Sequence, residues 1–463
     1  MAFVEDLAAA LPDGAVVTDP DLVEGYRYDR TTWLTPGRPA AVAFPSSTAE
    51  VATAVGVASR HRVPIVPRGA GSSLCGGSQA IDGALTLCLE RMDRVLAIDP
   101  VDQLARVEPG VLNADVSGAA RDHGLFYPPD PASKAFCSIG GNVATNAGGL
   151  CCVKYGVTRD YVARLEVVLA DGRVIETGHD TIKGVAGLDL TGLFVGSEGT
   201  LGIVTRVDVR LRPAPDGAST MVAFFPTLGT AGDAVAALTA SGLQLSLCEI
   251  MDRGTVTAVD DWMRMGLDRD AAALLLVQSD APAPLRAADV ERAAVLCDRA
   301  GASYTTFTAD PDEAEALLQA RRLAGPALER LGEPIWDDVG VPRSRIPALL
   351  DRIEQVASRH GAEVYTFGHA GDGNMHPVLL VPHGDEEART RALAAFDGIL
   401  EAALDLGGTI TGEHGVGSAK AHLLAREVGA DNLAVQRAIK HALDPQDLLN
   451  PGRWLVPVAP GAR

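Results

Sequence analysis

The sequence lacks the features of a membrane-inserted or exported chain. No run approaches the roughly 20 uncharged apolar residues that a membrane helix requires. The N-terminal residues, MAFVEDLAAALPDG, have neither the basic start nor the long apolar stretch of a signal peptide. The 7 cysteines include no CxxC pair, which suits a reducing cytosol. We therefore expect a cytoplasmic protein without membrane insertion.

Positive charge is also scarce. The chain has 40 Lys and Arg residues against 60 Asp and Glu residues, a net charge of −20, which repels phosphate backbones and anionic lipid. We therefore expect no nucleic-acid partner. Hydrophobic residues make up 47% of the 463 residues and charged residues 22%, which is typical of a globular enzyme too long for one core.

Residues 1–215 have the pattern of a strand-and-loop domain. AVAFP near residue 41 predicts a strand, Ser47-Thr-Ala-Glu50 is a capping box that opens a helix to about His61, and VPIVP predicts the next strand. Glycine is then dense, and the short apolar segments TLCL, LEVVLADG, LFVG and GIVTRVDVRL predict strands. Asp171-Gly172 predicts a hairpin turn between two of them.

The pattern changes after Arg212-Pro-Ala-Pro-Asp216. Residues 216–400 alternate Ala/Leu-rich helical stretches with strands such as MVAFFP, ALLLVQ and EVYTFGH, which predicts a second, substrate-binding α+β domain. Residues 401–463 are interpreted as a C-terminal segment that returns to the first domain.

Three glycine-rich segments stand out in the first domain: PRGAGSSLCGG at 67–77, SIGGNVATNAGG at 138–149 and GSEGTLG at 196–202. Consecutive backbone N–H groups in such loops form nests for phosphates, and missing Cβ atoms permit close approach. One such loop alone would indicate only a tight turn; three indicate an extended anionic cofactor. A nicotinamide cofactor is disfavoured because no GxGxxG opens a helix, and no P-loop motif occurs.

A histidine pair flanks a turn signal in His369-Ala-Gly-Asp-Gly-Asn-Met-His376. If Asp372-Gly373 forms a two-residue hairpin turn, His369 lies opposite His376. Opposed imidazoles on neighbouring strands are close enough to share one metal ion. The alternative is a loop with incidental histidines.

A second cluster follows in GGTITGEHGVG at 407–417. Glu413 would complete a His2Glu set that suits Zn with one position open for substrate, and Mn or Fe would also fit. His414 would remain as a general base near neutral pH. The alternative for this pair is a capped loop before a helix.

Six motifs in this order, ending in LDPQDLLNPGRW, resemble those of the FAD-dependent D-2-hydroxy acid dehydrogenase family. That family includes the FAD-bearing subunit of glycolate oxidase, D-lactate dehydrogenases and D-2-hydroxyglutarate dehydrogenases, within the vanillyl-alcohol-oxidase/p-cresol-methylhydroxylase (PCMH) superfamily. The resemblance covers nearly the whole chain. It implies an α+β fold, with a PCMH-type FAD-binding domain followed by an FAD-linked oxidase C-terminal domain of ferredoxin-like type.

The resemblance also implies a role for individual residues. His369, His376 and Glu413 would be metal ligands, His414 the base, and Arg321 the partner of the substrate carboxylate, with Arg322 as its rival. Ser72 stands where relatives with a covalent flavin carry His, so FAD is expected to be non-covalent. The FAD-binding residues implied are Pro67, Arg68, Gly69, Ala70, Gly71, Ser72, Ser73, Gly76, Ser138, Gly140, Gly141, Asn142, Thr145, Asn146, Gly148, Gly149, Glu198, Gly202, Ile203 and Asn450.

Two departures from the family pattern bear on the substrate. Trp336 and Val378 stand where relatives that handle dicarboxylates tend to have Lys and Asn. A buried site without these polar groups would reject 2-hydroxyglutarate. The expected activity is therefore metal-assisted oxidation of a D-2-hydroxy monocarboxylate (D-lactate, glycolate or a longer apolar homologue) to the 2-oxo acid, with hydride transfer to FAD.

Two alternatives remain open at this point: a same-fold FAD oxidase of another alcohol or a phenol, and an FAD-carrying subunit of an oxidoreductase complex. The electron acceptor is equally open among a quinone, an electron-transfer flavoprotein, a cytochrome and O2. The family further implies a homodimer.

Overall fold

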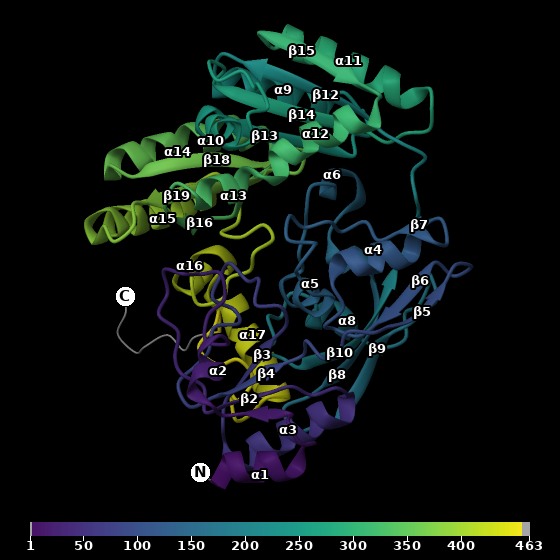
Figure 1. Ribbon diagram of the computed structural model, residues 1–463, viewed down its shortest axis with the longest axis vertical. Coiled ribbons are helices and arrows are strands. Elements are labelled where there is room, and N and C mark those ends of the chain that lie inside the picture. The colour runs from purple at the N-terminus through teal and green to yellow at the C-terminus, as the bar shows by residue number, and fades with distance from the viewer. Residues whose placement is uncertain (1, 456–463) are drawn as a thin grey trace. The chain divides into compact units, whose positions relative to one another are not determined.

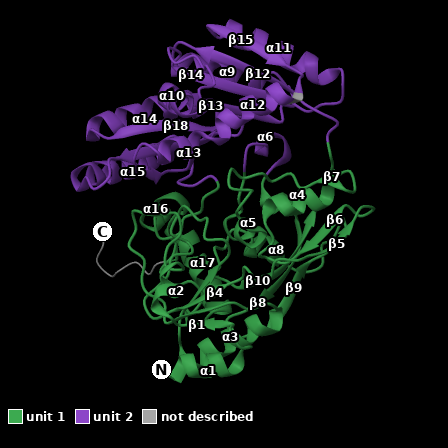
Figure 2. Cartoon of the chain, viewed as in Figure 1, with its two compact units in different colours: residues 1–148, 157–214, 413–463 green, residues 149–156, 215–412 purple. Residues whose placement is uncertain are grey.

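The computed structural model describes residues 2–455, which form two compact units (Figures 1 and 2). Unit 1 comprises residues 1–148, 157–214 and 413–463, and unit 2 comprises residues 149–156 and 215–412. Residues 401–412, expected in the returning segment, thus belong to unit 2. Within the described range, no helix is long and apolar enough to cross a membrane.

Unit 1 contains short helices around three small sheets. Its helices are α1 (Ala2–Ala10), α2 (Pro20–Glu24), α3 (Thr48–His61), α4 (Asn113–Arg121), α5 (Ile139–Thr145), α7 (Thr158–Tyr161), α8 (Leu190–Phe194), α16 (Ala421–Val428) and α17 (Ala430–Leu443). Its strands are β1 (Val16–Val17), β2 (Ala41–Ala43), β3 (Ile65–Arg68), β4 (Leu85–Cys88), β5 (Val95–Asp99), β6 (Leu104–Val107), β7 (Leu125–Phe126), β8 (Val162–Val168), β9 (Val174–Gly178), β10 (Ile203–Arg210) and β11 (Arg212–Pro213).

The sheets of unit 1 bring the C-terminal segment beside the first glycine loop. The first sheet has the order β1-β2-β4-β3, in which β2, β4 and β3 run parallel. The second is antiparallel with the order β5-β6-β10-β8-β9, and β7 pairs with β11. Ile65 of β3 forms a parallel bridge with Leu449, so residues 448–450 lie next to the strand that leads into residues 67–77.

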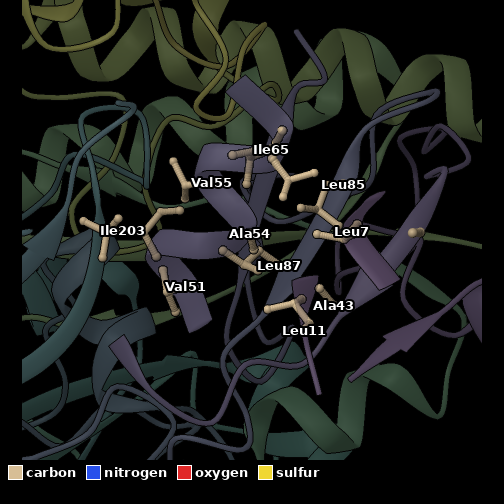
Figure 3. Packing of buried hydrophobic residues seen from close by; sticks show 14 of the residues in the cluster. Leu7, Leu11, Ala43, Val51, Ala54, Val55, Ile65, Leu85, Leu87 and Ile203 are labelled. Carbon is tan, nitrogen blue, oxygen red and sulfur yellow. The ribbon is translucent and has the colours of Figure 1, made fainter. Parts of the chain in front are cut away.

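Helices α1 and α3 pack on the first sheet to form the core shown in Figure 3. The hydroxyl of Ser47 accepts the Glu50 N–H at the start of α3, as the capping box predicts. Val51 and Val55 of α3 are fully buried with Leu85 and Leu87 of β4. Each such side chain contributes about 1.5–3 kcal/mol by leaving water, which holds α3 against β4, the strand paired with β3.

Most predicted elements of unit 1 are confirmed, and two are wrong. The β8–β9 hairpin turns at Gly172, which has φ +84°. LFVG does not form a strand, because Asp189 caps a helix, α8, that includes Leu193 and Phe194. The second glycine segment is not a loop throughout, because Ser138 caps the helix α5.

Unit 2 is a large antiparallel sheet with helices packed on it. Its strands are β12 (Ser219–Phe225), β13 (Leu247–Asp252), β14 (Ala273–Ser279), β15 (Tyr304–Thr308), β16 (Glu333–Trp336), β17 (Val339–Gly340), β18 (Glu363–His369) and β19 (Asn374–Val381). Its helices are α6 (Cys152–Tyr155), α9 (Leu228–Ala240), α10 (Arg253–Met263), α11 (Leu285–Arg299), α12 (Pro311–Arg322), α13 (Ala324–Glu329), η1 (Arg343–Arg345), α14 (Ile346–His360) and α15 (Glu386–Asp405). The strand order is β15-β12-β14-β13-β18-β19-β16, and β17 also pairs with β19.

Helix α6 belongs to unit 2, although the residues that flank it in the sequence, up to 148 and from 157, belong to unit 1. The ammonium group of Lys154 and the hydroxyl of Tyr155 both donate to the carboxylate of Asp280, directly after β14. A Cβ on Gly371 would lie 2.8 Å from Val153, so the β18–β19 turn also packs against α6. These contacts explain why residues 149–156 leave unit 1.

Candidate active site

The three glycine-rich segments meet in unit 1. A Cβ on Gly69 would lie 2.3 Å from the hydroxyl oxygen of Ser138, so only glycine permits the first segment to approach the second. The N–H of Glu198 donates to the carbonyl of Ala144 at 2.8 Å, which joins the third segment to α5. Segments far apart in sequence thus form one cluster of backbone and small side chains.

This cluster has the chemistry that a diphosphate requires. Residues 69–74, together with Gly140 and Gly141, are partly exposed, so their backbone is accessible to a ligand. The only carboxylate in the three segments is Glu198, which is buried and hydrogen-bonded to protein. Backbone N–H groups and hydroxyls without a competing negative charge fit the pyrophosphate of FAD.

Glu198 links the third glycine segment to the segment that carries Glu413 and His414. Its two carboxylate oxygens accept the N–H groups of Val416 at 2.7 Å and Gly417 at 2.8 Å. Burial raises the pKa of Glu198 to about 7, against the two N–H donors, which lower it. The carboxylate therefore holds residues 416–417, and its expected contact with FAD stays a prediction.

Asn450 holds the glycine segments together. Its side-chain amide donates to the carbonyls of Gly77 and Glu198, both at 2.8 Å. Its amide oxygen accepts from Arg453 at 3.1 Å. The side chain thus joins the first segment to the third, and its contact with a flavin ring stays a prediction.

In unit 2, His369 and His376 lie on the same face of the sheet, with ring centroids 5.0 Å apart. The predicted register of their hairpin is wrong by two residues: His369 pairs with Asn374, and His376 pairs with Phe367. The connection spans residues 370–373 instead of Asp372-Gly373 alone. A shift of two residues keeps each side chain on its face, so the two imidazoles remain diagonal neighbours.

A buried carboxylate, Glu249 of β13, contacts both His369 and Arg321. One oxygen lies 2.8 Å from Nδ1 of His369, and the other accepts from Nε of Arg321 at 2.7 Å. Arg321 is buried and also lies over the ring of Phe367, 4.6 Å from its centroid. Its rival Arg322 is bound to Glu315 and is more exposed, so Arg321 is the arginine that reaches this face of the sheet.

A second buried carboxylate, Asp338, lies beside His376. Its Oδ1 is 3.8 Å from Nδ1 of His376, and its Oδ2 accepts from the hydroxyl of Thr411 at 2.7 Å and the N–H of Gly412 at 2.9 Å. Histidines that bind metals are usually oriented by a carboxylate hydrogen-bonded to the ring, as Glu249 is to His369 at 2.8 Å, whereas Asp338 and His376 are at an ion-pair distance. The donor set of unit 2 therefore fits a divalent metal.

Trp336 and Val378 are direct cross-strand partners on β16 and β19. Val378 is two residues from His376 and lies on the same face, and Trp336 packs edge-on against Phe367 with centroids 6.4 Å apart. The two positions at which the chain departs from the dicarboxylate pattern thus form one apolar wall beside the histidines.

The sequence matches two family models along most of its length. Residues 39–178 match an FAD binding domain, and residues 214–454 match the C-terminal domain of FAD linked oxidases. The chain belongs to the FAD-linked oxidase family. The matched FAD binding domain contains the first two glycine segments, and the matched C-terminal domain contains both histidines, Glu413 and His414.

Relatives of this FAD-linked oxidase chain are similar over nearly all of it. It is 42% identical to glycolate oxidase subunit GlcD of Bacillus subtilis, covering 92% of this chain and 91% of that protein. It is 35% identical to D-2-hydroxyglutarate dehydrogenase of Xanthomonas citri pv. viticola (96% and 95%), and 31% identical to D-lactate dehydrogenase of Anaerostipes hadrus (97% and 96%). The predicted resemblance to flavin-dependent 2-hydroxy acid dehydrogenases is confirmed.

Solved structures confirm the PCMH-type fold. p-Cresol methylhydroxylase with bound substrate has a TM-score of 0.82 at 20% identity, covering 98% of this chain and 96% of that one. 4-Ethylphenol oxidase from Gulosibacter chungangensis has a TM-score of 0.79 at 20% identity, with coverage of 98% and 96%.

The predicted residues fall into two groups, one on each unit of this FAD-linked oxidase. Unit 1 carries the glycine segments, Asn450, Glu413 and His414, and unit 2 carries His369, His376 and Arg321. Sequence reasoning missed Glu249 and Asp338. The available signal was an acidic residue inside the otherwise apolar strand LCEIM, because such a charge is rarely buried without a partner.

We expect Glu198→Gln to lower both stability and turnover. An amide has only one acceptor oxygen, so the N–H of either Val416 or Gly417 would face the NH2 group of the glutamine. Loss of that hydrogen bond should lower the free energy of unfolding by about 1–3 kcal/mol. Thermal unfolding and the rate of flavin reduction would measure the two effects. Glu108→Gln is the control, because Glu108 is a buried carboxylate of unit 1 that accepts hydrogen bonds from the backbone and guanidinium of Arg94. An unchanged reduction rate in Glu198→Gln would contradict the role of Glu198 in holding this segment.

Proposed function

We propose that the chain is a metal-assisted FAD-dependent dehydrogenase of D-2-hydroxy monocarboxylates. The observation that carries the proposal is on one face of the unit 2 sheet. There, the carboxylate of Glu249 joins His369 to the buried Arg321, and His376 lies beside His369. A metal-binding pair beside a carboxylate-binding guanidinium matches the two oxygen groups of a 2-hydroxy acid. The names of the relatives support the broader class of 2-hydroxy acids, because they include both monocarboxylates (glycolate, D-lactate) and a dicarboxylate (D-2-hydroxyglutarate).

The proposed metal ligands are His369, His376 and Glu413. Chain connectivity supports the inclusion of Glu413, because it directly follows Gly412, whose N–H donates to Asp338 beside His376. Two imidazoles and one carboxylate suit Zn with an open position, and Mn or Fe are alternatives.

The FAD site is proposed to lie over the clustered glycine segments of unit 1, with the contacts that the family resemblance implies. Ser72 lies in the accessible part of the first segment, and a serine cannot provide the histidyl link of covalent relatives. FAD is therefore proposed to be non-covalent, and it would dissociate from the protein on denaturation.

Arg321 and His414 are proposed to bind the substrate and move its proton. The guanidinium of Arg321 binds the substrate carboxylate in two-pronged fashion and so fixes the direction of the α-hydrogen. His414 accepts the proton of the 2-hydroxyl group as the alcohol becomes a carbonyl. FAD supplies the hydride acceptor, and the divalent ion supplies Lewis-acid stabilisation of developing negative charge.

The substrate side chain is proposed to be small or apolar. Trp336 and Val378 offer no partner for a second carboxylate, and burial of an unpaired charge is costly. We expect kcat/KM for D-lactate to exceed that for D-2-hydroxyglutarate by at least about 10²-fold.

Steady-state kinetics with an artificial electron acceptor would test this preference. The substrates are D-lactate, glycolate, D-2-hydroxybutyrate and D-2-hydroxyglutarate, with the wild type and Trp336→Lys/Val378→Asn. The double variant should show a smaller difference in kcat/KM between the monocarboxylates and D-2-hydroxyglutarate than the wild type does. Equal use of D-2-hydroxyglutarate by the wild type would overturn the monocarboxylate assignment.

The electron acceptor, the homodimer and the cytoplasmic location stay predictions. The acceptor would be a quinone, an electron-transfer flavoprotein, a cytochrome or O2. Stopped-flow reoxidation of the reduced flavin by each class would identify it.

A further inference from the structure

Glu249 connects two parts of the proposed site that have different tasks. It lies in the middle of β13, is 1% exposed, and contacts His369 with one oxygen and Arg321 with the other. Neither task requires the other, since a metal ligand and a substrate-binding arginine need no common partner. A single carboxylate nevertheless contacts both.

The placement of Glu249 follows from the sheet register. Ile250 pairs with Gly368 and Met251 with Phe367, so the same register puts Glu249 opposite His369 on the same face. Arg321, at the end of α12, reaches this face over the ring of Phe367. The carboxylate is therefore held by strand pairing and does not depend on a loop.

A carboxylate at this place selects one tautomer of His369. An ionised carboxylate only accepts hydrogen bonds, so the proton between Glu249 and His369 resides on Nδ1 of the imidazole. Nε2 then carries the lone pair that a metal ion needs. The same carboxylate accepts from Nε of Arg321, which leaves the two terminal nitrogens of the guanidinium to bind a substrate carboxylate.

We propose that Glu249 is a positioning residue that sets the metal-binding tautomer of His369 and the direction of Arg321 together. This inference rests on the proposed function and adds a residue to it. Glu249 touches neither substrate nor cofactor in this scheme, and it acts through the two side chains that do.

Glu249→Gln separates this role from simple space filling, because the amide has the same shape. If its oxygen accepts from Arg321, its NH2 group faces Nδ1 of His369 and forces the imidazole proton onto Nε2. If the amide is turned round, its NH2 group faces the Nε–H donor of Arg321. The first orientation keeps both hydrogen bonds but removes the Nε2 lone pair that a metal needs, and the second, which metal binding requires, breaks the contact with Arg321.

The experiment measures the affinity of the flavin-loaded, metal-stripped protein for Zn²⁺, in competition with a chromophoric chelator. We expect Glu249→Gln to raise the Zn²⁺ dissociation constant about 10–100-fold. At saturating Zn²⁺ we expect kcat/KM for D-lactate to stay about tenfold low, because Arg321 is no longer held. Arg321→Lys should lower kcat/KM while its Zn²⁺ affinity remains within threefold of the wild type.

Asp252→Asn is the matched control, because Asp252 lies on the same strand and caps α10 through Thr255 instead of contacting His369 or Arg321. It should keep the wild-type Zn²⁺ affinity. If Glu249→Gln does not fold, Glu249→Asp takes its place. The aspartate is one methylene too short to reach both partners, so this variant should also raise the Zn²⁺ dissociation constant.

The outcomes distinguish failure of this inference from failure of the proposed function. The role of Glu249 alone would be overturned if the Glu249 variant kept the wild-type affinity for Zn²⁺ while His369→Ala lost Zn²⁺. The Glu249 variant here is Glu249→Gln, or Glu249→Asp if Glu249→Gln does not fold. Wild-type Zn²⁺ affinity in His369→Ala would overturn the proposed metal site itself.

Discussion

His414→Ala is expected to slow the reduction of the bound flavin by D-lactate about 10²–10⁴-fold, the range for loss of a general base. The imidazole is proposed to take the hydroxyl proton, and alanine offers no group to replace it. FAD content should be unchanged, because the glycine segments of unit 1 remain intact. Anaerobic stopped-flow spectroscopy at the flavin absorption band measures this rate directly.

Two comparisons make the test of His414 specific. His422→Ala removes an exposed histidine eight residues further along the chain. The flavin of this variant should be reduced at the wild-type rate. Added imidazole should restore part of the rate to His414→Ala, because it supplies the missing base. If the flavin of His414→Ala were reduced at a rate within threefold of the wild-type rate, another group would have to act as the base.

Loss of either histidine of the proposed metal site is expected to have an equally large effect. His369→Ala or His376→Ala should lose the bound ion and slow flavin reduction about 10³-fold or more, since Lewis-acid stabilisation is worth several kcal/mol. The flavin spectrum should remain, because neither residue belongs to unit 1. Metal analysis of the purified variants, together with stopped-flow reduction, measures both effects.

His383→Ala is the control for this prediction, because His383 is an exposed histidine two residues beyond β19. It should retain both the ion and the rate. Glu413→Gln should resemble the histidine variants if the carboxylate is the third ligand. Full metal occupancy in Glu413→Gln would remove that residue from the ligand set.

Local sequence patterns were sufficient for the elements whose structure is decided locally. The capping residues of α3 and the Asp171-Gly172 turn signal each act within a few residues, and both elements are observed. The helix α5 was missed because glycine at 140 and 141 argues against a helix. The cap at Ser138 and the packing of the segment against Gly69 outweigh that preference.

The hairpin of His369 and His376 shows why a partly wrong prediction still brought the right residues together. The turn residues did not determine the register, which differs from the prediction by two residues. Because side chains alternate between faces with a period of two, this error left both imidazoles on one face. An error of one residue would have separated them.

The contacts of Glu249 could not be predicted from sequence, because they depend on pairing between distant strands. The carboxylate, His369 and Arg321 come from β13, β18 and α12, and only the assembled sheet brings them together. The anchoring of α6 on Asp280 is similar, because neither partner is marked by its neighbours in sequence.

The most direct test of metal-assisted oxidation of a D-2-hydroxy acid is anaerobic mixing of the purified flavoprotein with D-lactate and with L-lactate, before and after chelation. We predict rapid bleaching of the flavin by the D-enantiomer only, loss of that reaction on treatment with EDTA, and its recovery on addition of Zn²⁺ or Mn²⁺. A flavin that no 2-hydroxy acid bleaches, or that D-lactate bleaches equally fast after complete removal of metal, would contradict the account.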